Sequence, residues 1–206
     1  MSGHRARRGG ERVASGQLRG LSELAMPRTR IHVALLRGIN VGKSGRIKMA
    51  DLTRELALDG VQVVATVVQS GNLVIANWKS DSAQLARTIE ATLSRRASIT
   101  TRCLVRSSDE LDRILSANPL SEVASDPSRY LVHLCEPALT SRQWKVVVGE
   151  INAPEHVAFA AGSVYQWCPD GVSNAQLVSP LLERSSAVAV TARNWRTLES
   201  LAAACP

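Results

Sequence analysis

A glycine-rich loop directly after an apolar run carries the residues best suited to bind an anion. The loop reads GINVGKSGR over residues 38–46, and Arg37 precedes it. Glycine lets backbone N–H groups approach a ligand closely, and basic side chains add positive charge. The alternative is a solvated connection whose glycines only permit its turns. The candidate ligand-binding residues of this segment are Arg37, Gly38, Asn40, Gly42 and Lys43.

This loop lacks the spacing of a nucleotide-binding P-loop. A P-loop reads G-x-x-x-x-G-K-[ST], and the stretch between Gly38 and Gly42 is one residue too short. Gly45 also stands where the helix of a P-loop would already have begun. The loop is therefore not expected to hydrolyse ATP.

Two further polar segments are candidates to share a site with the loop. One contains Ser70 and Asn72 between two β-branched runs, and the other contains Arg193 and Asn194. The guanidinium group of arginine is a fork of N–H donors that suits a carboxylate or a phosphate. The alternative is local, because Ser70 and Asn72 are common turn residues and Asn194 can cap a helix predicted from Trp195. The sequence is compatible with both interpretations.

Cysteine and histidine show no pattern of a metal site or of nucleophilic catalysis. The cysteines lie far apart without a C-x-x-C pair, and the first three fall in apolar strand patterns that favour buried thiols. His32 and His133 also fall in apolar strands, where a hydrogen-bonded core histidine is the expected state. We expect no metal and no cofactor, and the sequence does not decide whether the protein is an enzyme, because triads assemble in space. The cysteines are Cys103, Cys135, Cys168 and Cys205.

The positive charge is concentrated in the first 30 residues. The formal net charge is +7; residues 1–30 contain seven arginines against two glutamates, or +5, which leaves +2 for residues 31–206. Residues 1–29 are rich in Arg, Gly and Ser and are expected to form a basic, disordered leader. The alternatives are a nucleic-acid-binding arm and a start placed too early, since Met26 directly precedes the first apolar run. No apolar run has membrane-spanning length and no secretory signal is present, which predicts a cytoplasmic protein.

A second class of function, nucleic-acid binding, depends on three aromatic residues. Tyr165 and Trp167 are two apart in one predicted strand, and Tyr130 falls in another. On ferredoxin-like sheets that bind RNA, aromatic residues in such strands stack on bases. The RNA-binding consensus is absent, since the strand reads GSVYQWC, and core packing is the better interpretation. A nucleic-acid-binding module that uses this face and the leader is the alternative function.

The elements that must position these residues repeat along the chain. Apolar runs and helical spacings predict the order β-α-β-β-α-β over residues 30–106. A connecting helix and loop follow at 107–128, and the same order is predicted again over 129–206, with a C-terminal helix. We therefore predict an α+β fold of two consecutive ferredoxin-like subdomains.

Three segments of the chain resemble one bacterial family. They read HVALLRGINVG (32–42), VVQSGNLVI (67–75) and LLERSSAVAVTARNWRTLESLA (181–202). They are similar to the signature segments of an uncharacterised family catalogued as domain of unknown function sixteen-ninety-seven, and the resemblance covers about residues 30–204 in order. It implies a small cytosolic α+β protein of two ferredoxin-like subdomains, and it implies no reaction.

The chain departs from this family pattern at two places. Lys43 and Ser44 stand where members carry a second glycine and a lysine, and Asn174 and Gln176 stand where members carry a basic pair. If that pair binds an anion in the family, the resemblance implies weaker binding here, with Lys43 as a partial replacement. We expect a protein that binds a small anionic ligand or a partner at the Arg37 loop, in an oligomeric state that the sequence does not predict.

Overall fold

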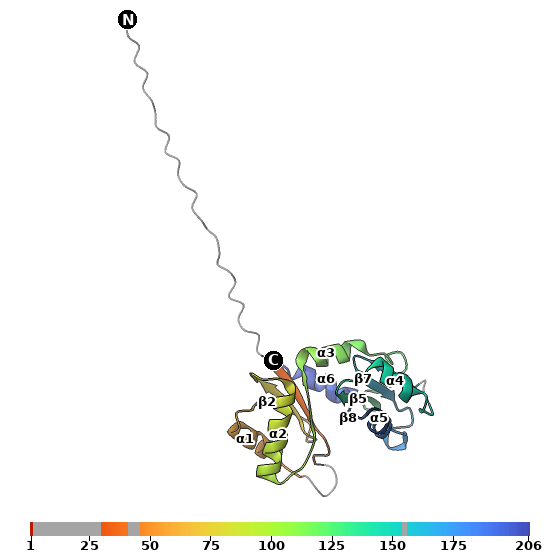
Figure 1. Ribbon diagram of the computed structural model, residues 1–206, viewed down its shortest axis with the longest axis horizontal. Helices are drawn as coiled ribbons and strands as arrows, with labels where there is room; N and C mark the ends of the chain where they lie inside the picture. The colour runs from red at the N-terminus through yellow and green to blue at the C-terminus, as the bar shows by residue number, and fades with distance from the viewer. Residues whose placement is uncertain (2–29, 41–45, 154–155) are drawn as a thin grey trace.

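Six α-helices and two four-stranded sheets make up the part of the chain that the structure describes (Figure 1). The computed structural model describes Met1 and residues 30–40, 46–153 and 156–206. The first half contains β1 (Ile31–Leu36), α1 (Met49–Leu58), β2 (Gln62–Val67), β3 (Asn72–Ala76), α2 (Ser82–Ala97) and β4 (Cys103–Ser107), and α3 (Ser108–Ala117) follows. The second half contains β5 (Tyr130–Glu136), α4 (Ser141–Val148), β6 (Val157–Ala160), β7 (Ser163–Trp167), the short 3-10 helix η2 (Val172–Asn174), α5 (Ser179–Ser186), β8 (Ala189–Asn194) and α6 (Trp195–Ala203). The predicted α+β class is confirmed.

Each half contributes one antiparallel sheet. The strand order is β2-β3-β1-β4 in the first sheet and β6-β7-β5-β8 in the second. The central strands β1 and β5 are buried on both faces, which explains their nearly continuous apolar runs. β4 and β8 are edge strands, and each leads directly into a helix, α3 or α6.

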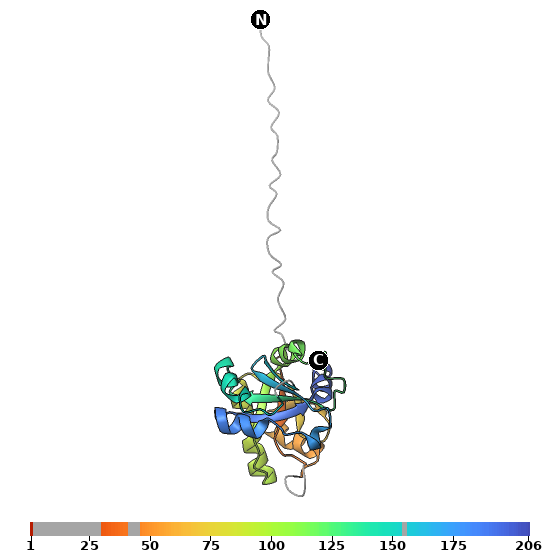
Figure 2. The same cartoon turned by 90° about the vertical axis from the view of Figure 1, so that its right-hand side faces the viewer.

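Three apolar cores hold the layers together. α1 and α2 cover the outer face of the first sheet, and α4 and α5 cover the outer face of the second (Figures 1 and 2). The inner faces of both sheets share a core with α3 and α6. Side chains of β1 alternate accordingly, because Val33 and Leu35 face the shared core whereas Ala34 and Leu36 face α1 and α2. We call the boundary between the two halves the seam.

Local sequence signals explain several boundaries. Ser107 forms a capping box with Glu110 at the start of α3. The β2–β3 hairpin requires Gly71, which has a φ of +74° and whose added Cβ would lie only 2.7 Å from Cβ of Leu36. Leu36 donates its N–H to the Gly71 carbonyl at 2.8 Å, so this hairpin is held at the end of β1 where the predicted site lies.

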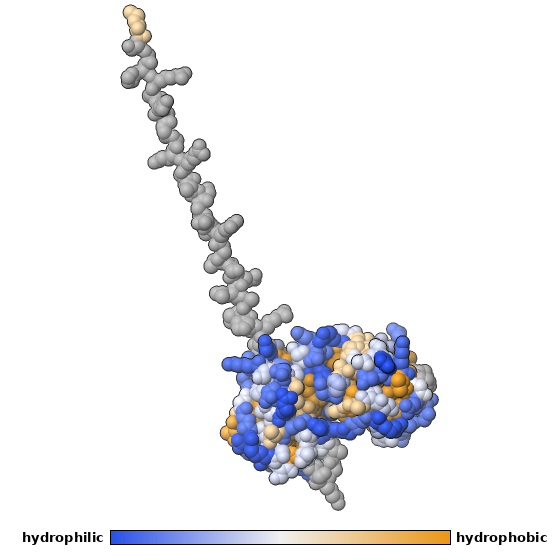
Figure 3. Space-filling model, viewed as in Figure 1, coloured by the Kyte–Doolittle hydropathy of each residue, from blue (hydrophilic) through white to orange (hydrophobic). Residues whose placement is uncertain are grey.

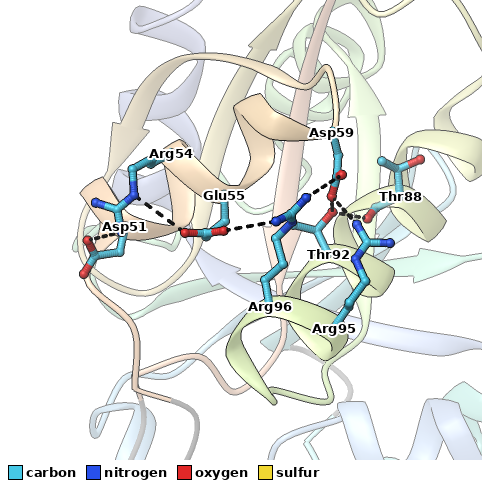
Figure 4. A network of polar contacts seen from close by, with 8 residues as sticks. All are labelled: Asp51, Arg54, Glu55, Asp59, Thr88, Thr92, Arg95 and Arg96. Atoms are coloured by element: carbon cyan, nitrogen blue, oxygen red, sulfur yellow. Dashed lines mark hydrogen bonds and ion pairs between the residues drawn. The ribbon is translucent and has the colours of Figure 1, made fainter.

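Outside the seam, charged side chains tie α1 to α2 (Figure 4). The Asp59 carboxylate accepts hydrogen bonds from the Thr92 hydroxyl at 2.5 Å and from Nη2 of Arg95 at 2.6 Å. The Thr92 hydroxyl is the main reason why the pKa of Asp59 is lowered. Arg95 is well exposed, and exposed ion pairs contribute little to stability. This network therefore marks a solvated surface of α1 and α2.

The face seen in Figure 1 is hydrophilic over much of its area, with apolar colour in the middle of the molecule (Figure 3). Within the described residues, no helix combines the length and the apolar character needed to cross a membrane.

Candidate functional site

Among the described residues, three arginines form hydrogen bonds across the seam, and two of them are predicted site residues. Arg37 follows β1 and donates from Nη1 and Nη2 to the two carboxylate oxygens of Glu183 on α5. Arg193 of β8 donates to the Asn72 side chain and to the Leu36 carbonyl in the first half. The third is Arg106 of β4, which donates to the Glu136 carboxylate and to the Cys135 carbonyl in the second half.

The structure brings Ser70, Asn72 and Arg193 together. Nε of Arg193 donates to Oδ1 of Asn72, and Nη2 donates to the Leu36 carbonyl at 2.6 Å. Asn72 is fully buried, and its Nδ2 donates to the Val67 carbonyl at 3.0 Å and to Oγ of Ser70 at 3.1 Å. Burial lowers the pKa of Arg193 to about 10, so the guanidinium stays charged at neutral pH. Among the described residues this cation has only neutral acceptors, and it ties the two halves together.

The Asn40 side chain is hydrogen-bonded to main-chain groups of Ile47 and Gln69. Its Nδ2 donates to the Gln69 carbonyl at 2.6 Å and to the Ile47 carbonyl at 2.9 Å, and its Oδ1 accepts the Ile47 N–H at 2.9 Å. Gly38 has a positive φ of +68°, which the turn after β1 requires. The remaining candidates of this loop, Gly42 and Lys43, lie outside the described residues.

Asn194 is the N-cap of α6. Its Oδ1 accepts the Thr197 N–H at 2.9 Å and the Thr197 hydroxyl at 2.6 Å. The capping interpretation of the sequence is therefore confirmed for this residue, and the side chain is already used within its own helix.

A cavity of about 200 Å³, which we call the seam cleft, opens between the two edge strands that face each other across the seam. β4 and β8 line it from either side, and α2 closes one end. Three arginines from three separate segments reach it together with two glutamates. The charged lining residues are Arg37, Arg87, Arg102, Glu90 and Glu136.

Two glutamates, Glu90 in the lining of the seam cleft and Glu183 beside it on Arg37, already accept hydrogen bonds from the protein. Glu90 accepts the Cys103 N–H of edge strand β4 at 2.8 Å. Glu183, which pairs with Arg37, accepts the Val190 N–H of edge strand β8 at 3.3 Å. Because each carboxylate covers a donor that its edge strand would otherwise expose, the two glutamates also protect the edges from further strand pairing.

The Cys103 thiol at the base of the seam cleft is unsuited to nucleophilic chemistry. Burial, with a smaller effect of Glu90, raises its pKa far above the ordinary value. The thiolate is the reactive form of cysteine, so this residue acts as an apolar lining group. Cys135 and Cys168 are buried as well, which confirms the prediction of buried thiols, and Cys205 is partly buried.

A second cavity, of about 300 Å³, lies within the second half beside η2. It contains both positions at which the chain lacks the basic pair of the family pattern. Nδ2 of Asn174 donates to the Asp170 carbonyl at 2.8 Å, and Oε1 of Gln176 accepts from Nδ2 of Asn152 at 2.7 Å. These neutral amides are bonded to neighbouring residues, so this cavity offers an anion much less than the seam cleft does.

His133 is a satisfied core histidine, as the sequence predicts. Its Nε2 donates to Oε1 of Gln166 at 3.0 Å, because that oxygen can only accept, and its Nδ1 accepts from the Ser179 hydroxyl at 2.6 Å. Burial lowers the pKa of His133 to about 4, so the ring is neutral at pH 7. The prediction is wrong for His32, since its buried Nδ1 has no partner among the described residues.

The aromatic residues belong to the core. Tyr130 and Tyr165 are almost completely buried between the sheets, and Tyr130 stacks on Trp195 with ring centroids 5.0 Å apart. The Tyr165 hydroxyl donates to the Ile114 carbonyl at 2.7 Å. Trp167 packs against the same core. The packing interpretation is confirmed, and the face of Tyr130, Tyr165 and Trp167 is not presented to nucleic acid.

Sequence reasoning missed the residues that complete the seam. Arg106, Glu183 and Arg102 were not among the predicted site residues. A signal for Arg106 exists, because it directly precedes the N-cap of α3 just as Arg193 directly precedes the N-cap of α6. No comparable local signal marks Glu183, which lies 146 positions from Arg37.

Comparison with known proteins concerns the family and the fold. A family model described as "Protein of unknown function (DUF1697)" matches residues 30–165. Among solved structures, the conserved bacterial protein SP0830 from Streptococcus pneumoniae is similar, with a TM-score of 0.67 and 20% sequence identity over 85% of this chain and 98% of that chain. At this identity the likeness concerns the fold alone. No curated protein matches the chain.

Proposed function

Since the chain belongs to the DUF1697 family of proteins of unknown function, we propose from its own geometry that it binds a small anionic ligand in the seam cleft beside Arg37. One observation carries this proposal: Arg37, Arg87 and Arg102 come from three separate segments and line one cavity. Convergent guanidinium groups are the usual protein partners of carboxylates and phosphates.

The accessibility of the Arg37–Glu183 pair supports ligand exchange. The side chains of Arg37 and Glu183 are 49% and 30% exposed, and an ion pair in such a setting contributes only about 0–1 kcal/mol. A carboxylate or phosphate that enters the cleft can therefore replace Glu183 on Arg37 at little cost. Arg102, with 77% of its side chain exposed, can add a second fork at the rim. The cavity of about 200 Å³ suits a ligand of only a few carbon atoms.

We also propose the finer architecture that the sequence predicts. In this proposal residues 30–106 and 129–206 are two ferredoxin-like subdomains joined by residues 107–128, and the repeated strand order around β1 and β5 supports it. Gly38 directly follows Arg37 and is proposed to belong to the same site, whereas the predicted residues Gly42 and Lys43 lie outside the described residues. A cytoplasmic location remains part of the proposal, and residues 2–29 of the predicted leader lie outside the described residues.

Calorimetric titration with a panel of small carboxylates and phosphate esters tests the binding proposal. We expect at least one compound to bind, with an affinity that falls as salt concentration rises. Arg37→Ala should abolish this binding and Arg102→Ala should weaken it. Arg95→Ala is the matched control, since it removes an exposed arginine of α2 that does not line the cleft, and it should leave binding unchanged. Equal binding by Arg37→Ala, or no binding by any compound, would overturn the proposal.

A further inference from the structure

Arg106 and Arg193 occupy equivalent positions in the two halves. Arg106 of edge strand β4 is opposite Val33 of β1, and Arg193 of edge strand β8 is opposite Val132 of β5. The next residue in each case is the N-cap of the following helix. The two arginines can therefore be compared atom by atom.

Most of their hydrogen bonds repeat. Nη1 of each arginine donates to the carbonyl of the preceding residue, Val105 or Ala192, at 2.8 Å. Nη2 of each crosses the seam to the carbonyl of the sixth residue of the opposite central strand. That residue is Cys135 for Arg106 and Leu36 for Arg193.

The two arginines differ at Nε. In the Arg193 network, Nε donates to Oδ1 of Asn72, and Asn72 lies opposite Leu35 of β1. The equivalent residue, opposite Leu134 of β5, is Ser163, whose shorter side chain does not reach Arg106. Among the described residues, neither Nε of Arg106 nor the Ser163 hydroxyl has a hydrogen-bond partner, although Ser163 is only 3% exposed.

A cavity of about 290 Å³, which we call the Ser163 cavity, lies where the Asn72 side chain would be if the two halves were identical. Both unpartnered groups border it. The Arg106 side chain is nine-tenths buried, with 10% of its surface exposed, so its Nε–H is held in place. Neither Nε of Arg106 nor Oγ of Ser163 is among the fully enclosed polar atoms that lack a partner, so both atoms reach open space and can donate to an oxygen atom supplied to this cavity.

We propose that the Ser163 cavity binds a small carboxylate, with one oxygen in the position that Oδ1 of Asn72 takes in the other half. That oxygen would accept from Nε of Arg106 and from the Ser163 hydroxyl. The planar carboxylate matches the planar amide that it replaces. Arg113 lines the cavity and adds positive charge, while Glu110 is held by its capping box and Glu136 by Arg106. The charged residues that line the cavity are Arg106, Arg113 and Glu110, a formal charge of +1, which matches a monoanion better than doubly charged phosphate.

This site is separate from the seam cleft, although Glu136 of the seam cleft pairs with Arg106. Arg37, Arg87 and Arg102 do not line the Ser163 cavity, and Ser163 does not line the seam cleft. A substitution that abolishes ligand binding in one cavity can therefore leave binding in the other cavity unchanged.

Nuclear magnetic resonance of the arginine Nε–H groups tests the proposal with sodium acetate as the probe. Acetate should shift the Arg106 Nε–H signal in a saturable way, whereas sodium chloride at equal ionic strength should not. The Arg193 signal should not move, because Asn72 already occupies the equivalent place. Arg37→Ala should leave the acetate response of Arg106 unchanged, which separates this site from the proposed function.

Two reciprocal variants sharpen the test. Ser163→Asn supplies the missing amide and should weaken acetate binding by about tenfold or more, whereas Asn72→Ser should make the Arg193 signal respond to acetate. If Ser163→Asn does not fold, Ser163→Ala serves, and it should weaken binding about threefold by removing one of two donors. An Arg106 signal that does not respond to acetate, or tighter binding of phosphate than of acetate, would overturn the proposal.

Discussion

Arg37 and Arg193 both reach across the seam, but their surroundings differ. Half of the Arg37 side chain is exposed, and its partner is the Glu183 carboxylate. Arg193 is partly buried, and its partners are the Asn72 amide and main-chain carbonyls. Water replaces the partner of an exposed group, whereas a buried acceptor that loses its donor stays unpaired. The accessible arginine is therefore suited to exchange its partner for a ligand, and the less accessible one is suited to hold the halves together.

The largest expected effect is on stability, at Arg193. Arg193→Ala removes the donors of the buried Asn72 oxygen and of the Leu36 carbonyl, and it should lower the free energy of unfolding by about 2–4 kcal/mol. Urea unfolding followed by circular dichroism measures this. A loss below about 0.5 kcal/mol would remove the distinction between the two arginines, because Arg193 would then behave as an exposed residue.

The buried His133 ring should make the stability of the folded protein depend on pH. The pKa of His133 is lowered in the folded state to about 4, below the ordinary value of 6.5. The unfolded chain therefore binds a proton as pH falls through 6.5 while the folded protein does not, so stability is lost between pH 6.5 and about 4. The expected loss from this group is about 3 kcal/mol.

Urea unfolding at pH 7 and pH 5, together with an imidazole titration by nuclear magnetic resonance, checks this prediction. A His133 ring that titrates near pH 6.5 in the folded protein would contradict it, since the ring would then be in contact with water. The slope of stability with pH should also be smaller in a folded variant that lacks His133.

The expected loss of stability at Asn194 lies between those at Arg193 and Arg37. Asn194→Ala removes the cap of α6 and should lower the free energy of unfolding by about 1 kcal/mol, because one helix N–H loses its acceptor. Asn194→Ser keeps a capping oxygen and serves as the control. Thermal unfolding distinguishes the two, and equal melting temperatures for both variants would mean that the cap contributes nothing.

The smallest stability effect is expected at Arg37. Arg37→Ala should lower the free energy of unfolding by no more than about 1 kcal/mol, because both members of the ion pair reach solvent. The same urea experiment as for Arg193→Ala gives a direct comparison. A loss of several kcal/mol would show that Arg37 supports the fold, and the ligand proposal for the seam cleft would lose its main argument.

Much of the molecule could be predicted because its signals are local. The apolar run of β1, the glycine of the β2–β3 hairpin and the N-caps Ser107 and Asn194 each depend on a few neighbouring residues. The burial of Tyr130, Tyr165 and His133 follows in the same way, because they fall in apolar strands. The sequence also offered a shared polar site of Ser70, Asn72 and Arg193 as one of two interpretations, because of the hydrogen-bonding groups of these residues.

The α+β composition, the caps of α3 and α6 and the buried faces of the central strands follow from the sequence alone, because hydrophobic periodicity and capping act over one or two turns of chain. The pairing of Arg37 with Glu183 and the common cleft between β4 and β8 arise only in the folded molecule. The same is true of the cavity beside Ser163, which holds the register position that Asn72 has in the other half. These contacts join residues far apart in sequence, and they depend on how two separate sheets pack against each other. No local pattern encodes that geometry, because the packing of the two halves on their shared core places the two edge strands on either side of one cleft.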